Sequence, residues 1–351
     1  MTKGAPVPTS KDVAAAAGVS QSTVSYVMSG KRPISEKTRL RVEAAIEQLT
    51  YRPNAGARAL ASRKSQVIGL VIPITPEAHL GSLMEFIAVI AATARRHDHD
   101  VLLVTDEEGC QGLERVVGQQ LCDGLILMQV EAEDERIPVV RNLRVPVVFI
   151  GIPNDSAGLN CIDADFARAG EMCVEEMAAA GHTSGVIIGW RPRLVGSRLN
   201  YVDRFLSGAY GAAQRLQVSL RHVPATSDRD SIEAAVDACI ADADGKPAFV
   251  SPDMTVLELL PRILRERGLE PGRDATVIGM GPTPEALIEL QESTVLDIQP
   301  RVVSRRAVEI LFSLMQAENP DPGGLLELIP PLVIHRHGTA KPPVPSAQST
   351  H

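Results

Sequence analysis

The sequence predicts an α/β protein with a small all-α unit in front of a larger body of parallel β-sheet. Up to residue 53, apolar residues recur at helical spacing in three short segments. From residue 66 on, short continuous apolar runs alternate with segments of helical length. This alternation is typical of buried parallel strands with helices on both faces of the sheet. The 351 residues are enough for two or three domains.

The first 53 residues contain start and stop signals for three helices. Thr9 and Asp12 have the spacing of a capping box, and Gly18 ends the helix that follows. A second helix begins after Ser20, and a third begins at Ser35. The residues expected to form their shared core are Val13, Ala17, Val24, Val27, Val42, Ala45, Ile46 and Leu49.

Seven apolar runs predict the strands of the body. They are VIGLVI (67–72), DVLLVT (100–105), DGLILM (123–128), PVVFIG (146–151), SGVIIG (184–189), PAFVS (247–251) and ATVIGM (275–280). Segments such as 83–97, 167–181 and 255–268 predict the helices between them. About 270 residues of this pattern are large for one sheet and natural for two. The tail, 339–351, is rich in Pro and Ser and is expected to be disordered.

The net charge of −8 conceals an asymmetry. Residues 1–65 contain 11 Lys and Arg against four Asp and Glu, a net charge of +7, whereas the remainder has a net charge of −15. A basic unit on an acidic body favours contact between that unit and a polyanion, although a basic solvated surface would have the same composition. Five scattered cysteines without a C-x-x-C pair, and no apolar leader or membrane-spanning run, favour a reducing cytoplasm.

The first two helices and their glycine turn form a helix-turn-helix motif, whose second helix can enter the major groove of DNA. Gln21 can pair with adenine, Ser22 can bond several base edges, and Tyr26 offers a ring and a hydroxyl. The amides at the start of the helix can meet phosphate. The alternative is a Ser- and Thr-rich helix that is merely solvated.

Residues 10–73 resemble the DNA-binding head and hinge of the lactose-repressor family of bacterial transcription regulators. The family pattern K-D-V-A-x-x-A-G-V-S-x-x-T-V-S matches residues 11–25. The pattern V-S-x-x-T-R-x-x-V matches residues 34–42 with Ile34 in place of Val, and Y-x-P-N-x-x-A-R-x-L matches residues 51–60. The resemblance implies a helix-turn-helix head over 9–53, after a flexible segment 1–8, and a hinge helix with linker over 54–65.

The resemblance also implies roles for individual residues. Gln21, Ser22 and Tyr26 fall at base-reading positions, with Tyr26 where Arg or His is common. The positions that correspond to phosphate contacts are Thr9, Ser20, Thr23, Ser25, Ser35, Tyr51 and Asn54. In the hinge, Ala57, Arg58 and Leu60 fall at minor-groove positions, and Leu60 is expected to enter the base stack and bend the duplex. The alternative for Leu60 is packing against the next domain.

For the body, 66–338, the resemblance implies a periplasmic-binding-protein-like fold of two doubly wound parallel-sheet subdomains. The expected subdomains are 66–163 with 294–320, and 164–293 with 321–338. Ligands of such folds bind at the carboxyl ends of the strands. The effector-binding candidates are Trp190, Arg191, Arg204 and Asp253. Trp190 could stack on a sugar, or be a surface or interface residue.

Several positions depart from the family pattern. Gly151-Ile152 replaces the frequent Asp-Arg, and Phe205 stands where an effector arginine is expected, with Arg204 one place away. The segment VIGMGP, 277–282, lacks the usual acidic pair. The effector is therefore unusual or absent.

The sequence contains little that indicates a metal site or an enzyme. The histidines of HDH (97–99) and HRH (335–337) lack further metal ligands nearby and are expected to be solvated. The sequence has no dinucleotide fingerprint, P-loop or nucleophile–base set, so we expect neither an enzyme, a cofactor nor a metal.

The sequence therefore predicts a cytoplasmic, homodimeric repressor that binds a pseudo-palindromic operator in double-stranded DNA and responds to a small molecule such as a sugar. Two alternatives remain, namely an effector-independent DNA-binding regulator and a solute-binding protein without DNA function.

Overall fold

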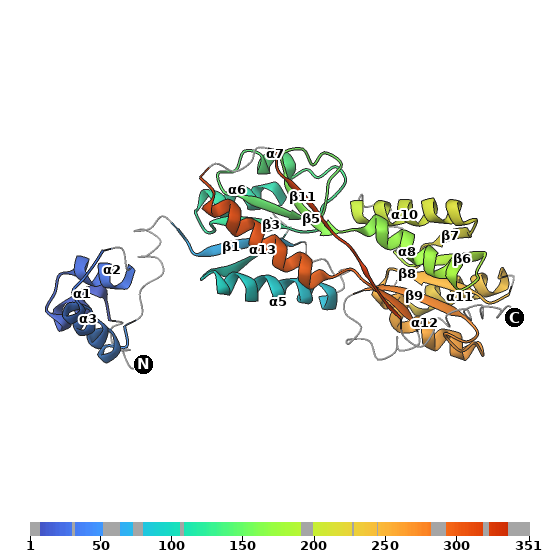
Figure 1. Ribbon diagram of the computed structural model, residues 1–351, viewed down its shortest axis with the longest axis horizontal. Coiled ribbons are helices and arrows are strands. Elements are labelled where there is room, and N and C mark those ends of the chain that lie inside the picture. The colour runs from blue at the N-terminus through green and yellow to red at the C-terminus, as the bar shows by residue number, and fades with distance from the viewer. Residues whose placement is uncertain are drawn as a thin grey trace, which may run out of the picture. The chain divides into compact units, whose positions relative to one another are not determined.

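The computed structural model contains two units, Met1–Gln66 and Val67–His351, which are considered separately (Figure 1). The structure describes residues 8–29, 32–51, 64–72, 80–105, 109–190, 199–226, 228–243, 245–281, 293–318 and 323–335. Among the described helices, none is long and apolar enough to cross a membrane.

The first unit consists of the three expected helices, α1 (Ser10–Ala17), α2 (Gln21–Ser29) and α3 (Glu36–Gln48). The predicted capping box is confirmed, because the Thr9 amide donates to Asp12 and the Thr9 hydroxyl accepts from the Asp12 amide. Gly18 ends α1 with φ +63°, a left-handed conformation that glycine adopts without steric cost.

A small apolar core holds these helices together. Val13, Val24 and Val42, one from each helix, are fully buried. The other predicted core residues also belong to this cluster, which contains Ala14, Val19 and Tyr51 in addition. This core contains mostly Ala and Val, and an N-cap of the kind seen at Thr9 typically contributes about 0.5–2 kcal/mol to the stability of such a unit.

The second unit contains two lobes with the same strand order. The first lobe has a six-stranded sheet, β2-β1-β3-β4-β5-β11, in which every pairing is parallel. Its strands are β1 (Val67–Ile72), β2 (Asp100–Thr105), β3 (Gly124–Leu127), β4 (Val147–Ile150), β5 (Asn160–Ala164) and β11 (Leu325–Ile329). Helices α5 (Leu80–Arg96) and α13 (Pro300–Gln316) cover one face, and α6 (Gly109–Gly118) and α7 (Ile137–Val140) cover the other.

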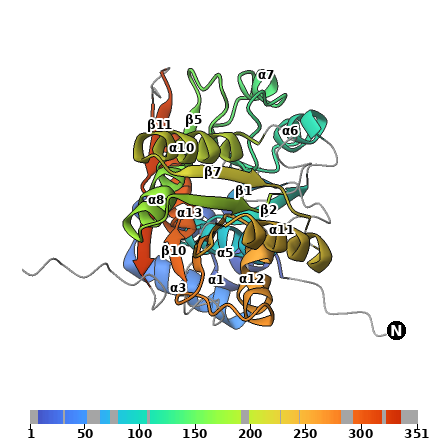
Figure 2. The same ribbon diagram turned by 90° about the vertical axis from the view of Figure 1, so that its right-hand side faces the viewer.

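The second lobe repeats this arrangement with one change. Its sheet has the order β7-β6-β8-β9-β10-β12, and only the edge strand β12 is antiparallel. Its strands are β6 (Ser184–Ile188), β7 (Ser219–Val223), β8 (Ala248–Ser251), β9 (Thr276–Gly281), β10 (Thr294–Asp297) and β12 (Leu332–His335). Helices α8 (Phe166–Ala179) and α10 (Asn200–Leu216) lie on one face, and α11 (Arg229–Ala241) and α12 (Met254–Glu266) lie on the other (Figure 2).

The chain passes between the lobes three times, and two passages differ from the expected boundaries. The second passage follows β10 and therefore lies at 298–299 rather than at 293. The third lies at 330–331 rather than around 320, because β11 still pairs with β5 of the first lobe. Pro330 and Pro331 occupy this passage, and since proline has no N–H to donate, they end one strand before the next begins.

The histidines of 97–99 are not simply solvated. Among the described residues, no group of three or more His, Cys, Asp or Glu could hold a metal ion. The expectation of a solvated side chain is wrong for His99, which is only 11% exposed and has its Nε2 3.4 Å from the Asp123 carboxylate. His97 stacks on the ring of Phe312, and His99 meets the same ring edge-on. In the second motif, His335 is exposed as expected, whereas positions 336 and 337 lie outside the described residues.

Candidate nucleic-acid interface

Helix α2 presents a polar face opposite its core face. Val24 is fully buried and Val27 packs on the same cluster. Gln21, Ser22 and Ser25 are exposed, and Tyr26 is half-buried. Residues three and four apart are neighbours on a helix, so these four side chains form one continuous polar surface. The structure thus brings together all three residues predicted to read bases.

Hydroxyl groups gather at the start of α2. The Ser20 hydroxyl accepts a hydrogen bond from the Thr23 amide at 3.2 Å, and its oxygen lies 2.7 Å from that of Ser22 and 2.8 Å from that of Thr23. Gln21 extends from the same turn and donates from Nε2 to the Ser10 hydroxyl of α1 at 2.7 Å. The start of α2 is therefore fixed to α1 while its hydroxyls face solvent.

Three of the predicted phosphate-contacting residues are helix N-caps. Thr9 caps α1, Ser20 caps α2, and Ser35 caps α3 by accepting from the Thr38 amide at 3.3 Å. Helix N-termini attract anions through their free amides and their dipoles. Tyr51 differs from these residues, because its ring packs on the apolar core of the head.

A contact that the sequence did not predict lies beside this polar face. The guanidinium carbon of Arg32 is 5.3 Å from the centre of the Tyr26 ring, within the range of a cation–π interaction. Arg32 itself is exposed. The sequence feature that could have drawn attention to Arg32 is its place directly before Pro33, because a proline restricts the backbone of the residue before it.

The predicted hinge residues Asn54, Ala57, Arg58 and Leu60, and the effector candidate Arg191, lie outside the described residues.

In the second unit, Trp190 follows β6 at the carboxyl end of the sheet. Its side chain is only 4% exposed, so the alternative of a surface tryptophan is wrong. The indole packs edge-on against the rings of Tyr201 and Phe205 of α10. Trp190 also has φ +47°, which is uncommon for a residue other than glycine. Backbone strain of this kind tends to gather at functional sites.

Arg204 joins α10 to the first passage between the lobes. Its guanidinium donates to the Asp163 carboxylate of β5 at 2.7 Å and to the Ala164 carbonyl at 3.1 Å. Burial raises the pKa of Asp163 to about 6, although the charge and hydrogen bond of Arg204 oppose this shift. In this conformation the effector candidate Arg204 is therefore occupied by a protein carboxylate.

Asp253 is the N-cap of α12 and accepts from the Thr255 amide at 2.9 Å. A Cβ atom on Gly189 would lie 2.7 Å from the Asp253 Cβ, so Asp253 sits directly against the residue that precedes Trp190. Burial, followed by the charges of Asp253 and Asp163, raises the pKa of Tyr201 to about 12. Trp190 and Asp253 thus lie near Tyr201, as does Asp163, the ion-pair partner of Arg204.

The start of α10 also contacts loops of the first lobe. Leu199 forms an isolated bridge with Glu131 after β3, and the side-chain Nδ2 of Asn200 donates to the Ile152 carbonyl after β4. Neither contact was predictable from a local sequence pattern, because each joins residues far apart in the chain. Together with the Arg204–Asp163 ion pair, they connect the second lobe to the ends of three strands of the first.

Both units of the chain match known protein families. Residues 9–54 match bacterial regulatory proteins of the lacI family, and residues 174–339 match the periplasmic binding protein-like domain. The HTH-type transcriptional regulator RafR of Escherichia coli is 27% identical over 325 residues, which cover 89% of this chain and 93% of that protein.

Two solved structures have the same fold. The lac repressor dimer bound to operator and the anti-inducer ONPF aligns with a TM-score of 0.79 and 24% identity, over 95% of this chain and 99% of that one. A complex of the transcriptional regulator CelR with cellobiose aligns with a TM-score of 0.64 and 22% identity, over 94% and 99% of the two chains. The expected α/β fold with a helix-turn-helix head is therefore confirmed. The chain belongs to the lacI family of bacterial regulatory proteins, which are DNA-binding transcriptional regulators.

Proposed function

We propose that this protein is a cytoplasmic, homodimeric repressor that binds a pseudo-palindromic operator and whose affinity for DNA is controlled by a small molecule. The polar face of α2 is the observation that supports this proposal best. It places Gln21, Ser22 and Tyr26 on one surface of a compact unit with capped helices. A side-chain amide, a hydroxyl and a phenol are suited to bonding base edges in the major groove.

The remaining head residues are proposed to position the protein on the DNA backbone. Thr9, Ser20 and Ser35 lie at helix N-termini, where hydroxyls and amides can bind phosphate. Thr23 lies beside Ser20, Ser25 is exposed on α2, and Tyr51 and Asn54 belong to the same proposed set. We assign Ala57, Arg58 and Leu60 to the minor groove, with Leu60 inserted between bases.

For the body we propose an effector site at the carboxyl ends of the strands, where doubly wound folds bind ligands. Asp253 and Trp190 border this region in the second lobe, and Arg191 follows Trp190 directly. The relative solved with cellobiose makes a sugar the first candidate class. Movement of one lobe against the other would shift the two hinges of a dimer and so change the affinity for DNA.

The DNA-binding proposal can be tested by selecting fragments from a randomised DNA library with the full-length protein. We expect an inverted repeat to be enriched and binding to weaken steeply with salt, because phosphate contacts release counterions. Gln21→Ala should cost about 1–3 kcal/mol of discrimination at one position of each half-site. Gln48→Ala removes the same amide from the exposed face of α3 and should leave the base preference unchanged.

Wild-type protein that enriches no sequence, or that binds DNA equally well at low and high salt, would contradict the proposed function. A Gln21→Ala variant that binds every sequence equally less well would contradict the base-reading assignment alone. Leu60→Ala should reduce DNA bending and affinity without unfolding the body. An unchanged bend angle would remove the wedge role of Leu60.

One observation favours a regulator that needs no effector. The Arg204 guanidinium is paired with Asp163, and the Trp190 ring is covered by Tyr201 and Phe205. Contacts within the protein thus take up the guanidinium of Arg204 and the ring of Trp190, which a ligand would otherwise contact. A panel of mono- and disaccharides, tested for changes in operator affinity of the full-length protein, distinguishes the two functions. A change with any sugar supports the effector-controlled repressor, and no change across the panel supports the effector-independent regulator.

A further inference from the structure

Arg32 has a fixed place beside the polar face of α2. The guanidinium carbon lies 5.3 Å from the centre of the Tyr26 ring. Tyr26 is one helical turn from Ser22 on the proposed base-reading surface, and its half-buried ring is backed by the head. Pro33 restricts the backbone of Arg32 to extended conformations, and Ser35 caps α3 just beyond it. The position of Arg32 is therefore restricted at its backbone by Pro33 and at its guanidinium by the Tyr26 ring.

The charge of Arg32 is not neutralised by an acidic side chain among the described residues of the head. Arg39 provides the contrast, because its guanidinium lies 2.6 Å from the Glu36 carboxylate and 3.9 Å from that of Glu43. Arg32 is exposed, and the described interaction that holds it is the aromatic face of Tyr26. Because an aromatic ring does not neutralise the positive charge, the guanidinium can still bind an anion or a group that offers hydrogen-bond acceptors.

Stacking on a ring leaves the hydrogen-bonding edge of a guanidinium free. The group is planar, and its five N–H donors lie in the plane rather than along the stacking direction. Guanine offers two acceptors in the major groove, O6 and N7, which a guanidinium binds through two parallel hydrogen bonds. The phenol of Tyr26 has one hydroxyl and cannot form such a paired contact.

We propose that Arg32, held on the ring of Tyr26, reads a guanine in each operator half-site. Tyr26 then acts as a positioning residue that presents the guanidinium, in addition to any contact made by its own hydroxyl. The inference rests on the proposed function, because it assigns a role within DNA recognition. It adds a base-reading residue that lies outside the recognition helix.

The test measures the base preference of full-length wild-type and variant proteins on a randomised DNA library. Wild type should require guanine at one position of each half-site. Arg32→Ala should reduce that discrimination about 5- to 150-fold, while preferences at the other positions persist. Arg32→Lys should reduce it similarly, because an ammonium keeps the charge but cannot form the paired contact.

Two variants of Tyr26 separate the ring from the hydroxyl. Tyr26→Phe keeps the platform and should retain the guanine preference, whereas Tyr26→Ala removes the platform and should weaken it. Arg41→Gln removes another exposed cation of the head, on α3, and should change no base preference. Because Arg32 and Arg41 are both exposed, neither substitution removes a core contact.

Two results would overturn the inference. If Arg32→Ala weakens binding to all sequences equally and lowers the salt slope by about one, Arg32 contacts phosphate rather than a base. If Tyr26→Ala leaves the guanine preference intact, the ring is not the platform. Both results leave a sequence-specific wild-type protein, so the proposed function survives them. A wild-type protein without base preference overturns the proposed function itself.

Discussion

The two lobes of the body have the same strand order but are fastened differently. In both lobes helices meet the sheet through side chains: a Cβ atom on Gly124 of the first lobe would lie 2.9 Å from a terminal carbon of Leu311, and one on Gly279 of the second would lie 2.9 Å from a terminal carbon of Leu257. In the second lobe, α8 and α10 approach until backbone meets backbone. A Cβ atom on Gly208 would lie 2.0 Å from the Ala167 carbonyl oxygen, and one on Gly170 would lie 2.1 Å from that of Phe205.

The two lobes therefore share a strand order but differ in how easily they can accommodate an added methyl group. The end of a leucine side chain can move by changing its rotamer, whereas a helix backbone can move only if the whole helix is displaced. Helix α10 also contains Arg204, and Trp190 packs against its Phe205. The lobe with the rigid helix pair is thus the lobe that carries most of the proposed effector residues.

The largest effect is expected for Gly208→Ala. The added methyl group would overlap the backbone of Ala167 and push α10 away from α8, which should cost about 3 kcal/mol of unfolding free energy. Gly124→Ala in the first lobe should cost no more than about 1 kcal/mol, because Leu311 can yield. Urea denaturation followed by the fluorescence of Trp190, the only tryptophan, reports on the second lobe.

Gly211→Ala is the matched control on the same helix. A Cβ atom at this position would meet no described atom within 4 Å, so the substitution should stabilise α10 by about 0.5–1 kcal/mol. Equal losses for Gly208→Ala and Gly124→Ala would show that the close approach of α8 and α10 has no energetic consequence.

The next effect concerns two Asp–Arg pairs with buried carboxylates, Asp163 with Arg204 at the lobe junction and Asp134 with Arg136 in the first lobe. Burial raises the pKa of Asp163 to about 6. Burial acts in the same direction on Asp134, but the hydrogen bonds and charge of Arg136 outweigh it, so the pKa of Asp134 is lowered. The two carboxylates should therefore affect stability in different pH ranges.

A raised pKa in the folded state favours folding at low pH, and this contribution is lost as pH rises through the folded value. The difference in unfolding free energy between wild type and Asp163→Asn should therefore fall by about 2 kcal/mol between pH 4 and 6. The corresponding difference for Asp134→Asn should be flat over that window and fall only below it, because the pKa of Asp134 is lowered. Parallel curves for the two variants would contradict the assignment.

The continuous apolar runs predicted strands correctly, six inside the sheets and one, β2, at a sheet edge. All seven apolar runs are strands, namely β1, β2, β3, β4, β6, β8 and β9. The missed strands β7, β11 and β12 lie at sheet edges, where polar and apolar residues mix because one side meets water. The missed strands β5 and β10 are buried but contain Asp163 and Asp297, which interrupt the apolar pattern.

In the candidate site, too, features set by local sequence spacing were predictable, whereas contacts between distant residues were not. The polar face of α2 follows from helical spacing within nine residues, so the sequence predicted it. The pairing of Arg204 with Asp163 joins residues 41 positions apart, and no local pattern indicates such a contact. The position of Arg32 over Tyr26 depends on how the chain turns after α2, which residue types alone do not determine.

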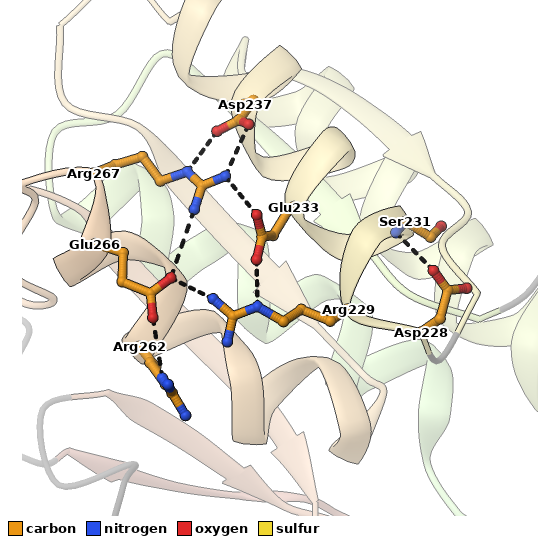
Figure 3. A network of polar contacts seen from close by, with 8 residues as sticks. All are labelled: Asp228, Arg229, Ser231, Glu233, Asp237, Arg262, Glu266 and Arg267. Carbon is orange, nitrogen blue, oxygen red and sulfur yellow. Dashed lines mark hydrogen bonds and ion pairs between the residues drawn. The ribbon is translucent and has the colours of Figure 1, made fainter.

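The smallest effect is expected for the surface ion pairs that fasten each lobe. Figure 3 shows Arg267 of the second lobe, which binds both carboxylate oxygens of Asp237 at 2.7 and 2.9 Å and also reaches Glu233. In the first lobe, Arg306 binds both carboxylate oxygens of Glu327 of β11 at 3.0 and 2.9 Å. Arg267 is 25% exposed and Arg306 is 40% exposed, so water screens the second pair more strongly.

Arg267→Ala should therefore destabilise the protein by at most about 1 kcal/mol, and Arg306→Ala by about half as much. Both losses should shrink when urea denaturation is repeated at high salt, because mobile ions screen the charges. Arg262→Ala is the control, since this side chain is 69% exposed and should contribute almost nothing. A larger loss for Arg306→Ala than for Arg267→Ala would mean that the attachment of β11 matters more than the connection between α11 and α12. The first lobe would then depend more on surface charge than the second.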